Sequence, residues 1–296
     1  MAKVGFIGLG IMGRPMSKNL IKGGCDLMVT DLNKAAVDEI VAAGATAGTY
    51  EEIAENCEVI FISLPNGAIV NSVLFGEGGV AQYVKAGTVI CDTSSVTPTE
   101  SKNCAAKLAE KGAGFIDCPV SGGEPKAIDG TLAFMCGGTQ EAYDKAEPYI
   151  MKMASSSLLV GPSGSGSVTK LTNQAIVNLT IAAVGEAFVL AAKAGADPEK
   201  VYQAIRGGLA GSTVLDAKVP MILDRNFVPG GKISINHKDI KNVLATAHDI
   251  DVPMPLTAQL FEIQQALKVS GHFEDDHGGY VQYFEQLADC QVKRVK

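Results

Sequence analysis

The segment Val4-Gly5-Phe6-Ile7-Gly8-Leu9-Gly10-Ile11-Met12-Gly13 decides the fold of this chain. It begins with a short apolar run that predicts a buried strand, and the glycines that follow have the spacing Gly-x-Gly-x-x-Gly. Such glycines permit a tight turn, let a pyrophosphate approach the backbone, and allow a helix to pack closely on the strand. The segment therefore predicts the first turn of a Rossmann-like domain. We assign the dinucleotide contacts of this turn to Gly8, Leu9, Gly10, Ile11, Met12 and Gly13.

An acidic residue stands where the second strand is expected to end. Asp31 follows the apolar run Leu27–Thr30 and lies 18 residues beyond Gly13, close to the ~20 residues typical of dinucleotide-binding folds. A carboxylate at this position can accept hydrogen bonds from the ribose hydroxyls of NAD and would repel the 2′-phosphate of NADP. The sequence thus favours NAD as cofactor, while the nearby Lys34 leaves use of NADP open.

Short apolar runs alternate with helical stretches as far as about Val160, a pattern that predicts a parallel sheet covered by helices on both faces. Helices that end at glycine are expected within this part, as at Lys34–Ala43 and Glu100–Lys111. The predicted strands are Val4–Ile7, Leu27–Thr30, Val59–Leu64, Val89–Asp92, Phe115–Cys118, Leu132–Cys136 and Leu158–Val160.

A run of small residues, Gly161–Ser167, interrupts the pattern and indicates a boundary between domains at 1–162 and 163–296. Beyond it, strand signals nearly vanish, and Val168–Lys193 predicts a long apolar helix buried against more than one neighbour. Further helices are expected at about 198–206, 237–250, 257–270 and 278–290. The predicted fold is α/β: an N-terminal Rossmann-like, doubly wound domain followed by an all-helical C-terminal domain, joined by a long interdomain helix.

Composition excludes several kinds of partner. A net charge of −7 and a pI near 5.2 argue against nucleic acid and anionic membranes, because no global positive field would attract them. We expect neither a signal peptide nor a membrane span, and a cytoplasmic location. The seven cysteines include no Cys-x-x-Cys pair and indicate reduced thiols. The acidic residues are scattered, and even the cluster Glu274–His277 is better explained by solvated faces and helix N-terminal acids, so we expect no metal site.

Four motifs together resemble the β-hydroxyacid dehydrogenase family, and the resemblance covers nearly the whole chain. It implies a Rossmann-like domain, a helical second domain, an active site in the cleft between them, and reduction of a small carboxylate-bearing aldehyde to its hydroxy acid. The motifs are Gly8–Met16, Asp117–Gly123, Gly164–Gln174 and His237–Ile240.

Carried over position by position, the resemblance implies that Lys170 is the catalytic residue and that Ser121, Gly122, Gly123 and Asn173 bind substrate. It also implies that Ser95 and Lys238 lie on the cofactor side.

The residue types suit these roles. An ammonium can polarise a carbonyl and protonate the developing alkoxide, and Lys170 and Asn173 are spaced so that one bound substrate can meet both. A hydroxyl and glycine amides suit a carboxylate.

Two polar loops follow predicted strands and should open onto the cofactor crevice. One contains Leu64, Pro65 and Asn66, which we also assign to the cofactor; the other is Asp92–Ser95. Taken alone, each loop is equally consistent with an ordinary turn and helix cap, with Ser95 and Thr97 competing for the cap position. His237 is a tempting acid or base, but a histidine near a helix start is more often a packing or cap residue, and we leave it out of the catalytic set.

Within the family, the stretches Ser121–Leu132 and Ile205–Lys218 are similar to the members that reduce tartronate semialdehyde to glycerate. Related substrates stay open: 3-hydroxyisobutyrate, 2-(hydroxymethyl)glutarate and succinic semialdehyde. So does a catalytically silent NAD(H)-binding sensor or scaffold. Gly231 stands where the family commonly has phenylalanine, which would widen the pocket if that aromatic shapes it. The apolar character of Val168–Lys193 suggests a homo-oligomer, either a dimer or a tetramer.

Overall fold

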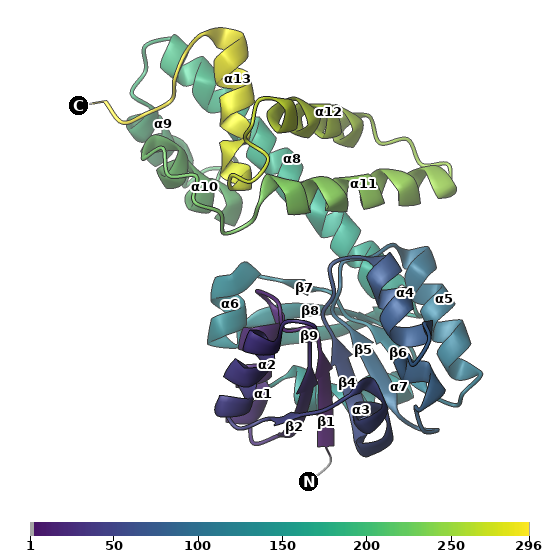
Figure 1. The fold of residues 1–296 in the computed structure, drawn as a ribbon. Helices are drawn as coiled ribbons and strands as arrows, with labels where there is room; N and C mark the ends of the chain where they lie inside the picture. Colours follow the sequence, from purple (N-terminus) through teal and green to yellow (C-terminus); the bar gives the residue numbers. More distant parts are fainter. Residues whose placement is uncertain (1–2, 296) are drawn as a thin grey trace. The chain divides into compact units, whose positions relative to one another are not determined.

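The chain forms two compact units in the computed structural model, which describes residues 3–295. The first unit is Met1–Lys170 and the second is Leu171–Lys296. Figure 1 shows all the strands in the first unit and only helices and loops in the second. This division confirms the predicted class, an α/β N-terminal part followed by a helical C-terminal part.

The sheet of the first unit has the strand order β3-β2-β1-β4-β5-β6-β8-β7, with β9 paired to β8. Neighbours from β3 through to β6 are parallel, as predicted. The prediction of a parallel sheet is wrong for β8 with β6 and β7, to which it runs antiparallel, whereas β9 is parallel to β8. The strands are β1 (Lys3–Ile7), β2 (Asp26–Thr30), β3 (Thr46–Ala47), β4 (Cys57–Ile62), β5 (Val89–Asp92), β6 (Gly114–Asp117), β7 (Val120–Ser121), β8 (Leu132–Gly137) and β9 (Ala154–Gly161).

Apolar side chains project from both faces of this sheet into two buried clusters, so the central strands are apolar at successive positions. Phe6 and Phe61 stack on one face with centroids 6.0 Å apart, within a buried cluster that includes residues of α1, α2 and α7. Ile7 and Ile60 belong to the opposite cluster, with residues of α3, α4 and α5. The helices are α1 (Gly13–Lys22), α2 (Lys34–Ala42), α3 (Tyr50–Asn56), α4 (Gly67–Phe75), η1 (Val80–Gln82), α5 (Pro98–Ala109), α6 (Gly123–Asp129) and α7 (Gln140–Ile150).

Helices account for the regular structure of the second unit. Four expected helices are present with shifted ends, and α9 begins as predicted with Asp197 as N-cap and Pro198 in the first turn. Helix α10, which Ser212 caps and which contains Pro220, was not predicted from the sequence. The helices are α8 (Ser165–Lys193), α9 (Pro198–Ile205), α10 (Thr213–Leu223), α11 (Ile233–Asp249), α12 (Pro255–Val269), η2 (His277–Tyr280) and α13 (Val281–Ala288).

Helix α8 runs out of the first unit and through the second. Within the second unit it packs closely, because a Cβ at Gly185 would lie 3.1 Å from Val281 Cα, and the Tyr280 hydroxyl donates to Asn178. It also keeps exposed apolar residues, Ile176 (62%) and Leu190 (72%), so not all of its apolar surface is covered within this chain. By length and composition alone α8 could cross a membrane, but 44% of its most apolar window is buried and core helices of soluble proteins meet the same criteria.

Candidate active site

The glycine-rich turn has the geometry of a phosphate cradle. Gly8 has φ +96°, and a Cβ there would lie 2.3 Å from the Ser63 carbonyl oxygen. A Cβ at Gly13 would lie 2.0 Å from the Gly8 carbonyl oxygen, so both positions require glycine. At Gly10 an added Cβ would meet nothing within 4 Å, which leaves the backbone accessible at the start of α1. These residues fit a dinucleotide pyrophosphate.

Asp31 joins the end of β2 to this turn. One carboxylate oxygen accepts the Leu9 amide at 2.6 Å, and the other accepts the Asn33 amide at 2.6 Å. Leu32 beside it is 99% exposed. From the sequence, Asp31 was expected to contact only the ribose; in the structure its carboxylate also holds the glycine-rich turn through the Leu9 amide.

The polar loops after β4 and β5 lie at the same sheet edge. The Leu64 amide donates to Ser94 Oγ at 2.9 Å, so the segment that contains Leu64, Pro65 and Asn66 is next to the loop that contains Ser95. Asn66 caps α4 through its side chain. Thr97, not Ser95, caps α5, which decides the competition that the sequence left open.

Two buried carboxyl groups end neighbouring strands at this edge. Asp92 and Asp117 are both 1% exposed and are aligned in the register of β5 and β6. Burial raises the pKa of Asp92 to about 7 and that of Asp117 to about 6. Asp92 Oδ1 accepts the Ser94 amide, whereas Oδ2 has no hydrogen-bond partner among the described residues. The burial of these two carboxyl groups and their raised pKa values were not predicted from the sequence.

Replacing Asp92 with Asn should remove a pH dependence of stability. With its pKa raised from 3.8 to about 7, Asp92 holds its proton more tightly in the folded state than in the unfolded one. Its stabilising contribution is therefore present below about pH 4 and is lost as pH rises through 7, by about 2 kcal/mol between pH 5 and 7. Denaturant unfolding without cofactor should show this slope in the natural protein and a shallower one in Asp92→Asn. The exposed control Asp129→Asn should keep the natural slope, and an unchanged slope in Asp92→Asn would contradict the argument.

The segment Asp117–Gly123 lies against the start of α8. The Lys170 ammonium donates to the Val120 carbonyl oxygen at 2.9 Å, which brings it close to Ser121 at the end of β7. Gly122 (φ +139°) and Gly123 (φ +70°) follow in conformations that favour glycine. The structure thus brings Lys170 to Val120, which directly precedes the three residues predicted to hold a carboxylate.

The second unit carries the other two predicted residues. Asn173 lies one turn beyond Lys170 on the continuous helix α8. Lys238 is on α11, and its ammonium lies 3.3 Å from an Asp239 carboxylate oxygen. Asp239 is buried and accepts the Gln174 side chain at 2.6 Å, so the α11 end that bears Lys238 is tied to α8.

Two expectations for the second unit, on His237 and on the acidic residues, can be compared with the structure. His237 stacks on Phe261 at 4.4 Å between ring centroids, a packing role as expected. Asp276 is fully buried and accepts Lys218 at 2.7 Å, and it caps η2, as expected of a helix N-terminal acid. Asp239 is buried inside α11 and so lies neither on a solvated face nor at a helix start. Side chains grouped as in a metal site do not occur among residues 3–295. All seven cysteines are reduced, five of them buried.

A Cβ at Gly231 would lie 3.2 Å from His277 Nε2. The imidazole thus occupies space next to Gly231, which argues against the expected widening of the pocket there.

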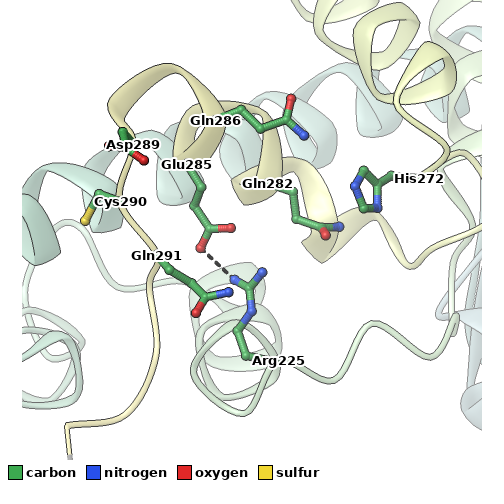
Figure 2. A pocket seen from close by; sticks show the side chains of 8 residues that line it. All are labelled: Arg225, His272, Gln282, Glu285, Gln286, Asp289, Cys290 and Gln291. Atoms are coloured by element: carbon green, nitrogen blue, oxygen red, sulfur yellow. Dashed lines mark hydrogen bonds and ion pairs between the residues drawn. The ribbon is translucent and has the colours of Figure 1, made fainter.

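A separate pocket of about 400 Å³ lies around Arg225 and Glu285, whose side chains pair at 2.6 Å (Figure 2). Its lining includes none of the predicted site residues.

The fold and the glycine-rich turn define a dinucleotide-binding protein. Residues 3–161 match the family described as the NAD-binding domain of 6-phosphogluconate dehydrogenase. Residues 164–284 match the family described as NAD-binding of NADP-dependent 3-hydroxyisobutyrate dehydrogenase. The chain therefore binds NAD or NADP.

Whole-length relatives make the assignment more specific. The chain is 40% identical over 291 residues to 2-hydroxy-3-oxopropionate reductase of Escherichia coli strain K12, covering 98% of this chain and 99% of that one. It is 36% identical to 2-(hydroxymethyl)glutarate dehydrogenase of Eubacterium barkeri, covering 98% and 97%. A solved structure of 3-hydroxyisobutyrate dehydrogenase from Mycobacterium tuberculosis superposes with a TM-score of 0.89 at 26% identity, covering 95% and 98%. The chain belongs to the β-hydroxyacid dehydrogenase family and is an oxidoreductase that acts on CH–OH groups.

Proposed function

We propose that this enzyme reduces tartronate semialdehyde (2-hydroxy-3-oxopropionate) to glycerate with NADH, with Lys170 as general acid. The observation that carries the proposal is the bond from the Lys170 ammonium to the Val120 carbonyl oxygen, at 2.9 Å. This bond holds a proton donor beside Ser121–Gly123, so an aldehyde whose carboxylate occupies that turn can present its oxygen to the ammonium. The 40% identity to a 2-hydroxy-3-oxopropionate reductase supports this substrate.

Each residue has one task in the proposed reaction. Ser121, Gly122 and Gly123 bind the substrate carboxylate through a hydroxyl and backbone amides. Lys170 polarises the aldehyde oxygen and donates its proton to the alkoxide that develops there. Asn173, one turn along α8, donates to a second substrate oxygen. NADH supplies the hydride when bound.

The cofactor is held by the first unit in this proposal, with residues 1–162 as the NAD-binding domain. The glycine-rich turn binds the pyrophosphate, and Asp31 accepts the ribose hydroxyls, which favours NAD over NADP. Leu64, Pro65, Asn66 and Ser95 border the cofactor at the strand ends, and Lys238 of the second unit contributes a positive charge.

Residues 163–296 are proposed as the substrate and oligomerisation domain. The exposed apolar residues Ile176 and Leu190 on α8 suit burial against a second copy in a dimer or tetramer. A soluble, cytoplasmic enzyme without nucleic-acid or membrane partners agrees with the net charge of −7 and the reduced thiols.

The rival substrates are 3-hydroxyisobutyrate, 2-(hydroxymethyl)glutarate and succinic semialdehyde. The 36% identity to a 2-(hydroxymethyl)glutarate dehydrogenase favours the second of these as the alternative. The experiment that separates them compares turnover of tartronate semialdehyde with turnover of each rival, with glycerate identified as the product.

A further inference from the structure

Helix α8 begins against a buried carboxylate from another element. Asp117, the last residue of β6, accepts the Gly164 amide at 2.7 Å through Oδ1 and the Ser167 amide at 2.8 Å through Oδ2. Amides at a helix start have no partner within the helix, and an anion there is favoured by the helix dipole. One side chain 47 positions before Gly164 therefore satisfies two backbone donors at the start of α8.

The start of α8 packs so closely against the sheet that no side-chain atom fits between them at two glycines. A Cβ at Gly166 would lie 2.3 Å from both the Asp117 and the Met135 carbonyl oxygens, and a Cβ at Gly137 would lie 2.7 Å from the Gly166 amide. Ser167 Oγ also lies 2.9 Å from Ser101 Oγ of α5. The first turn of α8 is thus held directly on the strand ends.

The segment Asp117–Gly123, which contacts the start of α8, also contacts Lys170. Val120, three residues after Asp117, accepts the Lys170 ammonium. Lys170 is three residues after Ser167 on α8 and so lies on the same side of the helix, one turn on. Ser121 follows Val120 directly. The segment Asp117–Gly123 therefore contacts α8 at its first turn and at Lys170, and continues into the proposed carboxylate site.

We propose that Asp117 is a positioning residue for the reaction: by holding the Gly164 and Ser167 amides it fixes where α8 begins, and so fixes the Lys170 ammonium beside Ser121. The inference rests on the proposed role of Lys170. Asp117 touches neither substrate nor cofactor in this account. It acts through the helix, and a small displacement of an aligned catalytic group is costly because proximity supplies much of the rate.

The test begins with Asp117→Asn, which keeps the side-chain shape but sets an amide donor against a backbone N–H. We expect kcat to fall about 10- to 100-fold, with KM and NADH affinity changed by no more than about twofold. Thr139→Ala is the matched control, since it removes an N-cap acceptor from α7, a helix with no site residue.

A double-mutant cycle separates positioning from general damage. In a Lys170→Ala background, Asp117→Asn should cause little further loss of kcat, because its effect passes through the missing ammonium. An equal further loss in that background, or a kcat like that of Thr139→Ala, would overturn the proposal. If the natural protein reduces no semialdehyde, the proposed function fails on its own. Hydrogen exchange still tests whether Asp117 holds the start of α8. The Gly164 and Ser167 amides should exchange faster in Asp117→Asn than in Thr139→Ala, and equal exchange in the two variants would refute that role of Asp117.

Discussion

Replacing Lys170 with Ala is expected to lower kcat for semialdehyde reduction by about 10²–10⁴-fold, the contribution typical of general-acid catalysis. The affinity for NADH should stay nearly unchanged, because the cofactor contacts assigned here lie elsewhere. Lys170→Arg should also be severely impaired, because a guanidinium keeps the positive charge but does not release a proton at neutral pH. Steady-state kinetics and NADH titration measure both quantities.

The control for these variants is Lys193→Ala. Lys193 lies at the other end of the same helix and donates to the Ala288 carbonyl oxygen, so its loss removes a lysine from α8 without touching the site. It should leave kcat close to the natural value. Near-normal turnover in Lys170→Ala would remove this residue from its proposed role.

Cofactor preference should reverse towards NADPH when Asp31→Ser and Leu32→Arg are combined. In the natural enzyme, NADP would place a phosphate against the Asp31 carboxylate, with only the exposed Leu32 beside it. We expect a preference for NADH of about tenfold or more, roughly 1.4 kcal/mol. The double substitution removes the repulsion and adds a planar donor suited to phosphate. The measurement is the ratio of kcat/KM for NADH to that for NADPH.

The structure adds a control to this experiment. Because Asp31 also accepts the Leu9 amide, its removal loosens the glycine-rich turn and should weaken both cofactors. Asp31→Asn, which keeps one acceptor oxygen, separates that loss from the charge effect. If Lys34 offsets the repulsion in the natural enzyme, Lys34→Ala should increase the preference for NADH. A natural enzyme that already prefers NADPH would show that the end of β2 was misinterpreted.

The glycine-rich turn and most strands could be predicted because their signals are local. Spacing of glycines and runs of apolar residues follow from backbone sterics and from burial on both sheet faces. The two-residue strands β3 and β7 are too short to show a pattern, and Pro220 weakens the helical pattern of α10. Strand direction is not local either: apolar periodicity is the same for parallel and antiparallel neighbours, so the reversal at β8 gave no signal.

In the candidate site, too, residues could be predicted from local motifs but contacts between distant parts of the chain could not. Motifs in the sequence predicted Lys170 and Ser121 as site residues, but did not predict the contact between Lys170 and Val120, 50 positions apart. Asp117 stands in a quoted motif, yet nothing local indicates that its partners are Gly164 and Ser167. A buried acid at a strand end becomes recognisable only when the tertiary structure shows which amides surround it.

The most direct test of the proposed function is kcat/KM with NADH for tartronate semialdehyde and succinic semialdehyde, together with kcat/KM with NAD for 3-hydroxyisobutyrate and 2-(hydroxymethyl)glutarate. Each oxidation is compared with that of glycerate, so that every comparison is made in one direction. We expect tartronate semialdehyde and glycerate to exceed their rivals by about tenfold or more, since every rival lacks the hydroxyl on the carbon next to the carboxylate and would leave a polar group of the site unpaired. One glycerate should form for each NADH oxidised. A rival that exceeds tartronate semialdehyde or glycerate by a similar factor would contradict the proposed substrate.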